Sequence, residues 1–398
     1  MKGKPVSILW VARMRFLKDL RIREVELARG LASRADIVAL DRSETAGWGE
    51  SSTLSKLRLR WQMARGGWAS WTENSIRHFR MPVVVGTGPV TNRAAAWINE
   101  RRIGMALDRF QCTMVFHSNP FLFLPPPAAG RRYRVHFDLV DNFFDGWKDS
   151  LVGRSRKRFL KDAVLRADSL SAISHSLCDR MEEFAGRRPA YVPNGAAVDE
   201  IERWPVARVQ EARARHRLEG KTALAYIGNH VDEFDGTEML VEAFQAARRH
   251  RPDLELLLVG PGSERVPRAR GLGLAEGVHV VGPVPTTEVW DYFHAADLGL
   301  LPFILEPGTH DCLPLKVLEF AAAGKPMLAT PLRELIRLDL PHMRFAPYDS
   351  AAWSSALQDP ATYAHPDRGA LKAAMRPFSW QAASEALARV MGLPTEPA

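Results

Sequence analysis

The sequence has few cysteines and no long apolar run, and both absences narrow the class of protein. Only three of its 398 residues are cysteines, namely Cys112, Cys178 and Cys312. They are too few and too scattered for a disulfide framework or a zinc site, and they indicate a reducing compartment. No run of about 18 apolar residues exists, which argues against a membrane-spanning helix. Residues 1–12 lack a small-residue cleavage site, so we expect a first β-strand there rather than a signal peptide.

Motifs for nucleic-acid binding are also missing, because the sequence shows no helix-turn-helix, zinc finger or RNP signature. Charge is nevertheless uneven. Residues 1–200 contain 33 Lys and Arg against 21 Asp and Glu, whereas residues 201–398 contain 21 against 25. A basic half can attract nucleic acid, an anionic membrane surface or phosphorylated substrates. Because no nucleic-acid-binding motif accompanies the charge, we expect no nucleic-acid partner.

Strand and helix patterns alternate along the chain, which predicts two doubly wound α/β domains. The expected strands are 6–12, 36–41, 81–88, 112–118, 134–140, 169–174, 222–228, 254–262, 278–284 and 297–303. The expected helices are 23–34, 92–110, 154–167, 238–250, 286–296, 315–323 and 378–391. Ser176 is expected to cap the helix that follows it, and Thr286 or Thr287 the helix at 286–296. A polar segment poor in core residues predicts a linker at 196–220.

The segment 311–330 is the most informative part of the sequence. Pro314 suits the first position of a helix, and Lys316 and Glu319 lie three residues apart on one side of it. A cation in the first helical turn opposes the helix dipole, which is reasonable if an anion also binds there. A carboxylate beside that end could accept hydrogen bonds from ribose hydroxyls. The alternative is an ordinary surface Lys–Glu pair on an exposed helix.

The surroundings favour a nucleotide-sugar site. Asp311, seven residues, Glu319 and then, from Ala321, A-x-x-G-x-P resemble the donor motif of GT-B glycosyltransferases, particularly family 4, and the turn at 191–195 resembles that family's V-P-N-G turn. The resemblance implies two Rossmann-like domains facing a cleft, an acceptor domain at 1–200 with the helix 378–391 crossing back, and a donor domain at 201–377. It also implies a donor site without metal or other cofactor, formed by Gly228, Asn229, Gly260, Val284, Asp311, Leu315, Lys316 and Glu319.

A second cluster of acids follows the strand at 134–140. Asp138, Asp141 and Asp145 lie where ligands bind in open α/β sheets. A carboxylate there can take the proton of an attacking hydroxyl, and we favour Asp141 as this base, with Asp138 as competitor and acceptor contact. Asp141 as a simple cap is the alternative. The stretch resembles the xanthan-type glucuronosyltransferases, which implies an inverting reaction with Lys316 at the leaving diphosphate.

Acceptor binding is expected on the basic half. The loop at 13–23 carries Arg13, Arg15 and Arg21, which contact an anionic acceptor or are simply solvated. Trp61, Trp68 and Trp71 alternate with cations, a pattern typical of a headgroup interface or of an amphipathic core helix. We expect a lipid-linked saccharide acceptor and a cytoplasmic protein on the inner face of the cell membrane.

One departure from the family pattern concerns the diphosphate. Family 4 enzymes usually carry an Arg and a Lys after the strand at 222–228, whereas this chain has Asn229, His230 and three acids. Either donor binding is weak or lost, or Lys316 has taken over the phosphate contact. His230 is expected as a turn residue rather than a ligand.

These observations favour a glycosyltransferase that uses a UDP- or GDP-type nucleotide sugar in polysaccharide or glycolipid synthesis. A sugar-nucleotide 2-epimerase on the same fold and a non-catalytic nucleotide-sugar-binding module are the alternatives.

Overall fold

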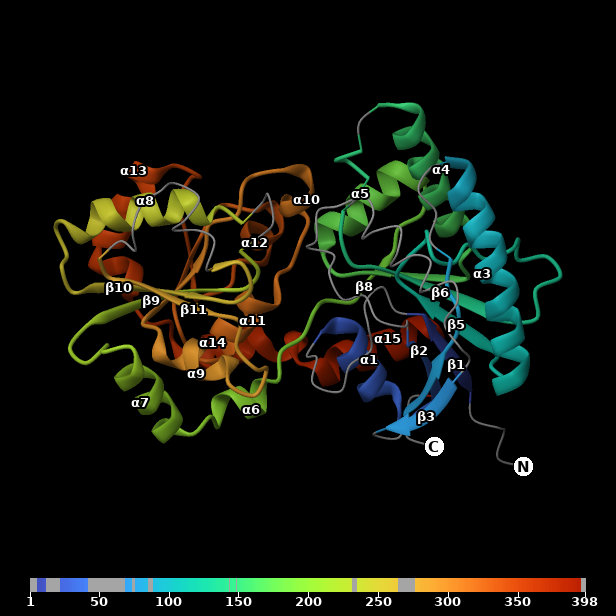
Figure 1. The fold of residues 1–398 in the computed structure, drawn as a ribbon, viewed down its shortest axis with the longest axis horizontal. Helices are drawn as coiled ribbons and strands as arrows, with labels where there is room; N and C mark the ends of the chain where they lie inside the picture. The colour runs from blue at the N-terminus through green and yellow to red at the C-terminus, as the bar shows by residue number, and fades with distance from the viewer. Residues whose placement is uncertain are drawn as a thin grey trace. The chain divides into compact units, whose positions relative to one another are not determined.

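The computed structural model divides the chain into two compact units, each described here by itself. It describes residues 6–11, 22–41, 69–73, 76–84, 89–142, 144–147, 149–230, 235–263 and 276–394 (Figure 1). Unit 1 comprises Met1–Pro193 and Trp380–Ala398, and unit 2 comprises Asn194–Ser379. The boundary lies seven residues before the expected one, and the last helix joins unit 1.

Unit 1 contains an eight-stranded sheet in the order β3-β4-β2-β1-β5-β6-β7-β8. All neighbouring strands are parallel except β3 and β4, which are antiparallel. The strands are β1 (Ser7–Val11), β2 (Asp36–Asp41), β3 (Ala69–Glu73), β4 (Ile76–Arg80), β5 (Met114–His117), β6 (Arg134–Leu139), β7 (Ser169–Ala172) and β8 (Ala190–Tyr191).

Both faces of this sheet are buried, because successive residues of a strand point to opposite sides. Leu9 and Val11 pack into one hydrophobic cluster with helices α3, α4 and α5, whereas Ile8 and Trp10 pack into another with α1 and α15. The helices are α1 (Arg23–Leu31), α3 (Pro89–Phe110), α4 (Leu151–Arg166), α5 (His175–Ala185) and α15 (Trp380–Met391). A continuous apolar strand such as β1 is typical of a parallel sheet covered on both sides.

Helices α1 and α15 come from opposite ends of the chain and pack against each other within unit 1. Their contact is closest at Gly30, where an added Cβ would lie 2.1 Å from Oγ and 2.6 Å from Cβ of Ser384. Glycine is thus required at this point so that the two helices can approach.

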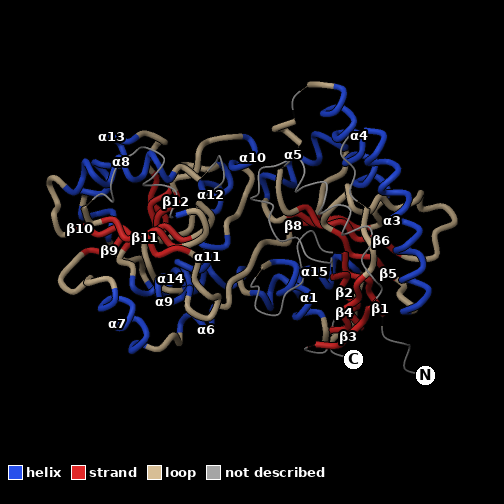
Figure 2. Tube along the Cα trace, in the orientation of Figure 1, coloured by secondary structure: helices blue, strands red, loops and turns tan. Residues whose placement is uncertain are grey.

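Unit 2 contains a six-stranded parallel sheet in the order β11-β10-β9-β12-β13-β14. Figure 2 shows both sheets as red strands with blue helices around them. The strands are β9 (Thr222–Ile227), β10 (Leu254–Val259), β11 (Val278–Gly282), β12 (Leu298–Leu301), β13 (Met327–Ala329) and β14 (Met343–Phe345).

The helices of unit 2 cover both faces of its sheet. Ala223, Ala225 and Ile227 of β9 pack with α9 and α11, whereas Leu224 and Tyr226 pack with α8 and α13. Figure 1 shows α9, α11 and α14 on one side of the sheet and α8 and α13 on the other. The helices are α6 (Val198–Glu202), α7 (Val206–Arg215), α8 (Thr237–Arg248), α9 (Val289–Ala295), α10 (Pro307–His310), α11 (Leu315–Ala322), α12 (Arg333–Leu338), α13 (Ser350–Gln358) and α14 (Arg368–Met375), with 3-10 turns at Pro360–Tyr363 and Arg376–Phe378.

The strand expected at 81–88 is wrong in position. Residues 81–84 have no regular structure, and the strand lies just before them as β4, which forms a hairpin with β3. Trp71 is therefore a strand residue whose ring stacks on His78 at 5.3 Å, not part of an amphipathic helix. Trp61, Trp68, Gly86 and Gly88 lie outside the described residues.

The linker expected at 196–220 is also wrong, because this segment belongs to unit 2. It forms α6 and α7, and Ile201, Ala212 and Leu218 are buried. Sparse apolar residues at long spacing were sufficient to fix α6 against α11 and α7 against α9.

Two expected helix caps differ as well. Ser174, not Ser176, caps α5 by accepting a hydrogen bond from the Leu177 amide, and Glu288 rather than a threonine precedes α9.

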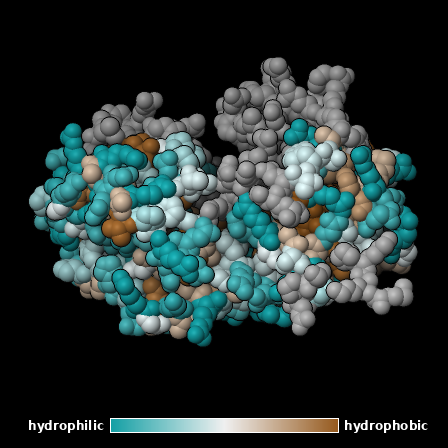
Figure 3. Space-filling model, turned by 90° about the horizontal axis from the view of Figure 1, so that it is seen from below, coloured by the Kyte–Doolittle hydropathy of each residue, from teal (hydrophilic) through white to brown (hydrophobic). Residues whose placement is uncertain are grey.

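Within the described ranges, no helix is both long and apolar enough to cross a lipid bilayer. Figure 3 shows one face of the molecule, on which hydrophobic residues form small separate patches among hydrophilic ones.

Candidate functional site

The carboxyl ends of β9 and β10 meet at two glycines. Gly228 follows β9 with φ +149° and Gly260 follows β10 with φ +127°, both in a region that favours glycine. A Cβ on Gly260 would lie 1.9 Å from the Gly228 carbonyl oxygen, and a Cβ on Gly228 would lie 2.4 Å from Nζ of Lys316. The two turns and Lys316 therefore meet at one point of the sheet edge, where only glycine fits.

Lys316 lies in the first turn of α11, and its ammonium group is held against aromatic rings. Nζ is 4.4 Å from the ring centroid of Tyr226 and 5.1 Å from that of Phe303. Lys316 is therefore half-buried, which argues against the alternative of an ordinary exposed surface pair. Cation–π attraction offsets the unfavourable position in the helix dipole. Pro314 precedes the helix as its N-cap rather than occupying the first position.

Glu319 lies one turn further along α11 and is half-buried. Its Oε1 accepts a hydrogen bond of 3.4 Å from Nε1 of the buried Trp290. This contact positions one carboxylate oxygen, and a carboxylate has further acceptor sites for ligand hydroxyls. Lys316 and Glu319 thus lie together at the carboxyl edge of the unit 2 sheet, as the sequence predicts.

Asp311 is positioned differently from the expectation. Its side chain is 1% exposed, and Oδ1 accepts a hydrogen bond of 2.9 Å from Nη1 of Arg333 in an ion pair. This geometry gives Asp311 a structural partner, and its contact with a donor sugar stays a prediction.

The remaining donor residues lie around the same edge. Asn229 follows Gly228 and is exposed, whereas Val284 and Leu315 are half-buried. His230 is buried, and its ring lies within hydrogen-bond distance of Thr237 Oγ1 at 3.1 Å and the Val259 carbonyl at 3.2 Å. These contacts hold the turn, in agreement with the expectation of a turn residue.

In unit 1, Asp138 is fully buried inside β6. Both of its oxygens accept hydrogen bonds of 2.8 Å from Arg23, and Ser171 donates another of 2.5 Å. Burial raises the pKa of the Asp138 carboxyl, but the Arg23 guanidinium outweighs this and holds the pKa below its usual range. The geometry argues against Asp138 as base or acceptor contact, because its oxygens are committed to Arg23. Arg23 itself starts α1 and is no solvated loop residue.

Asp141 lies in a bend just after β6 and is half-buried. Asp145, its neighbour in sequence, is engaged with Arg180 at 2.8 Å and with Asn142 at 2.8 Å. The role of Asp141 as a base stays a prediction.

Sequence reasoning did not single out His117, which ends β5 at the same sheet edge as Asp141. It is fully buried, its ring stacks on Phe137 at 4.6 Å, and burial lowers its pKa to about 3. The next residue, Ser118, donates a hydrogen bond to Glu24 of α1. The sequence signal that could have indicated these residues is the polar pair His117-Ser118 at the end of a buried strand. Arg13, Arg15 and Arg21, the predicted acceptor contacts, lie outside the described residues.

Part of the sequence is similar to known glycosyltransferases. Residues 221–360 match the family model described as Glycosyl transferases group 1. A glycogen synthase of Mycobacterium tuberculosis is 28% identical over 255 residues, which cover 62% of this chain and 59% of that protein. A phosphatidyl-myo-inositol mannosyltransferase of Propionibacterium freudenreichii is 26% identical over 183 residues, which cover 46% and 43%. The chain thus spans less than two thirds of the curated relatives it matches.

Solved structures show the same fold over the whole chain. A sucrose-phosphate synthase from Thermosynechococcus elongatus has a TM-score of 0.72 at 16% identity, covering 98% of each chain. HepE of Anabaena, solved in complex with UDP, has a TM-score of 0.70 at 13% identity, covering 97% of this chain and 100% of that one.

Residues 221–360 are thus similar to group 1 glycosyl transferases, and the solved structures confirm the expected α/β class with two parallel-sheet domains of the GT-B fold. These comparisons do not bear on the finer resemblance to xanthan-type glucuronosyltransferases.

Proposed function

We propose that this protein transfers a sugar from a nucleoside-diphosphate donor to a hydroxyl of a saccharide acceptor. The observation that carries the proposal is the meeting of Gly228, Gly260 and Lys316 at the carboxyl edge of unit 2, with Glu319 one turn away. Tight glycine turns bring backbone amides close to phosphate oxygens, and a helix N-terminus with a cation complements their charge. HepE, a structural neighbour, was solved with UDP and with UDP-glucose.

In the proposed reaction, a hydroxyl oxygen of the acceptor attacks the anomeric carbon while the bond to the diphosphate breaks. Lys316 and the amino end of α11 stabilise the negative charge that develops on the leaving diphosphate. Glu319 accepts hydrogen bonds from the ribose, and backbone groups near Val284 contact a uracil- or guanine-type base. This scheme assigns no step to a metal ion.

The proposal makes Asp141 the general base, as in the inverting xanthan-type enzymes. If Asp141 removes the proton of the attacking hydroxyl, attack occurs from the face opposite the diphosphate and the anomeric configuration is inverted. Asp141→Asn should then keep donor binding and lose transfer. NMR coupling constants of the product decide: a product anomer that matches the donor rules out Asp141 as this base.

The acceptor in this proposal is a lipid-linked saccharide at the inner surface of the cell membrane, where the protein is bound peripherally. Support comes from the excess of 12 positive charges in residues 1–200 and from a mannosyltransferase of phosphatidyl-myo-inositol among the sequence relatives.

A panel of UDP- and GDP-sugars tests the function directly. The purified chain should hydrolyse one of them slowly without acceptor and faster when the acceptor saccharide is added. Binding of a nucleoside diphosphate without any turnover would favour the non-catalytic module, a reading suggested by the missing cations at 229–236. Release of a sugar whose C2 configuration is inverted, from the UDP-sugar alone and without acceptor, would favour the epimerase.

A further inference from the structure

Helix α4 of unit 1 exposes a row of cations with a leucine at each end. The members of this α4 row follow one another at intervals of three and four residues, which places them on one side of the helix. All five are exposed: Leu151, Arg154, Arg158, Lys161 and Leu165. Leu151 is 77% exposed and Leu165 51%, so both present apolar surface to solvent. The row is about 21 Å long, at about 1.5 Å per residue.

The opposite side of α4 accounts for its attachment to the sheet. Phe159, Leu160, Ala163 and Val164 are buried there. The last three belong to the hydrophobic cluster that α4 shares with α3 and α5, and these helices pack beside it (Figure 1). The α4 row is therefore not required for packing.

The charges of α4 are almost all of one sign. The helix contains a single acid, Asp162, and six cations, which are Arg154, Arg156, Lys157, Arg158, Lys161 and Arg166. Arg154 forms an ion pair of 2.8 Å with Asp149, but within the described ranges Arg158 and Lys161 have no carboxylate at ion-pair distance. Like charges three or four residues apart destabilise a helix, and an anionic surface against the row would relieve this repulsion.

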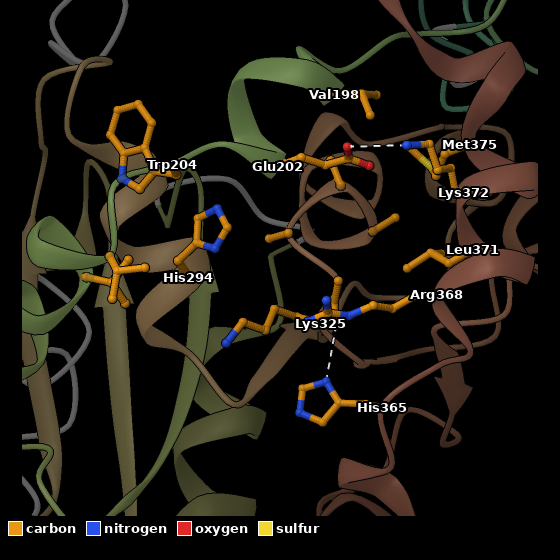
Figure 4. A pocket seen from close by; sticks show the side chains of 16 residues that line it. Val198, Glu202, Trp204, His294, Lys325, His365, Arg368, Leu371, Lys372 and Met375 are labelled. Carbon is orange, nitrogen blue, oxygen red and sulfur yellow. Dashed lines mark hydrogen bonds and ion pairs between the residues drawn. The ribbon is translucent and has the colours of Figure 1, made fainter.

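The cations around the cavity of unit 2 are arranged differently. This cavity, of about 640 Å³, lies at the carboxyl end of α11 (Figure 4). Lys372 is paired with Glu202 at 3.8 Å, and in Figure 4 the Lys325 side chain extends away from Arg368. Burial lowers the pKa of Lys325, and the charge of Asp297 opposes this shift. The cations of the cavity thus do not converge, whereas those of α4 share one exposed side.

The neighbouring helix α3 exposes a second mixed row. Trp97 and Met105 are each 53% exposed, and Arg101 lies between them, with Cζ 4.1 Å from the ring centroid of Trp97. Ile103 and Leu107, on the other side of α3, belong to the same hydrophobic cluster as the buried side of α4. The exposed sides of both helices therefore face away from the sheet. Tryptophan combined with cations is typical of a headgroup interface.

Three kinds of partner are compatible with an exposed basic surface. A second copy that used the same patch would place cations opposite cations. A nucleic acid would pair with the cations but leave the exposed leucines in water, and the sequence has no nucleic-acid-binding motif. A bilayer with anionic lipids offers phosphates to the cations and an apolar boundary to leucine and tryptophan, so it complements both parts of the surface.

We propose that the outward sides of α3 and α4 bind the surface of a bilayer that contains anionic phospholipids. The cations of the α4 row contact the lipid phosphates. The two leucines of the row and Trp97 of α3 enter the boundary between headgroups and acyl chains. This inference rests on the proposed function in one respect, because it specifies the surface for the peripheral membrane attachment. It does not depend on the donor site or on Asp141.

Flotation of the full chain with vesicles of phosphatidylcholine and phosphatidylglycerol tests the cations. The wild type should bind these vesicles more tightly than vesicles of phosphatidylcholine alone. Arg158→Gln with Lys161→Gln, the basic variant, should weaken binding about thirtyfold, or about fivefold for each cation near an anionic surface. Arg215→Gln with Arg249→Gln removes the same charge from exposed positions of unit 2 and should leave binding within about twofold of the wild type.

A second variant tests the apolar part. Trp97→Gln with Leu165→Gln removes one exposed apolar side chain from each helix, keeps every charge, and should weaken binding about fivefold or more. All substituted positions are exposed, so far-UV circular dichroism should show each variant folded.

The outcomes separate this inference from the proposed attachment. A wild type that does not bind anionic vesicles contradicts membrane attachment as a whole. Equal weakening by the basic variant and the unit 2 control, or no weakening by the basic variant, overturns the assignment to α4 alone. If the apolar variant binds as the wild type does, or if the wild type binds duplex DNA more tightly than vesicles, the surface is a polyanion site and the bilayer proposal is wrong.

Discussion

At the scale of single residues, Lys316 combines an unfavourable helix position with two aromatic neighbours. The first turn of α11 opposes its charge, whereas Tyr226 and Phe303 attract it. Its sequence position next to the A-x-x-G-x-P pattern was sufficient to predict its place at the sheet edge. Its aromatic neighbours were not predictable, because they come from β9 and from the segment after β12.

Lys316→Ala should reduce turnover by about two to three orders of magnitude, because it removes a preorganised cation from the leaving diphosphate. Loss of the cation–π contacts should also lower the free energy of unfolding by about 0.5–2 kcal/mol. Steady-state kinetics and urea denaturation measure the two effects. Arg249→Ala, at an exposed position just after α8, is the matched control and should change neither. Full activity of Lys316→Ala would contradict the phosphate contact.

His342 packs against α11, and its titration makes the stability of the protein depend on pH. It is fully buried, with Nε2 3.0 Å from the Val317 carbonyl, and burial lowers its pKa to about 4. The unfolded chain, with a histidine pKa of about 6.5, binds more protons between pH 6.5 and pH 4. The free energy of unfolding therefore falls as the pH drops through this window, by up to about 1.4 kcal/mol per pH unit for this group.

His342→Gln should reduce this pH dependence, because glutamine can donate to the same carbonyl and does not titrate. Urea midpoints at pH 7 and pH 5 measure it: the wild type should lose more stability on acidification than the variant. Equal losses would show that His342 is not protonated differently in the folded and unfolded states.

At the scale of elements, the sequence predicted the parallel strands and most long helices, because continuous apolar runs and helical spacing reflect burial. It failed at the β3–β4 hairpin, where Trp71, His78 and cations alternate without a clear apolar face. It also failed at the linker, where α6 and α7 are held by tertiary packing of a few residues such as Ile201 and Ala212. Local pattern did not contain that information.

The α1–α15 contact gives a prediction at this scale. Gly30→Ala should lower the free energy of unfolding of unit 1 by about 1–3 kcal/mol, because its methyl group overlaps Ser384. The double variant Gly30→Ala, Ser384→Gly removes both Oγ and Cβ and should be more stable than the sum of the two single changes predicts. Strictly additive effects in chemical denaturation would contradict the close contact.

At the scale of the whole molecule, the alternation of strands and helices predicted two α/β units. The finer site in unit 1 was less predictable. Asp138 looked like a functional acid in the sequence, but Arg23, 115 residues away, neutralises it in the core. A buried ion pair between distant segments cannot be identified from one chain without its fold.

The uneven charge predicts membrane binding by the full protein. Lys and Arg near an anionic surface contribute about 1 kcal/mol each, and the attraction fades within a Debye length. Binding to vesicles containing anionic lipid should therefore fall steeply with salt in a flotation assay. Equal binding to neutral vesicles would contradict an electrostatic attachment through residues 1–200.

The central claim is that unit 2 binds the nucleotide part of a sugar donor at the amino end of α11. Calorimetric titration of Glu319→Gln with the free nucleoside diphosphate and with the complete nucleotide sugar tests it most directly. Glutamine retains an acceptor for Trp290 but loses the charge offered to the ribose, so both ligands should bind more weakly by the same amount, about 1.5–3 kcal/mol. If only the nucleotide sugar binds more weakly, Glu319 contacts the sugar instead; if neither does, the nucleotide is not bound at this helix.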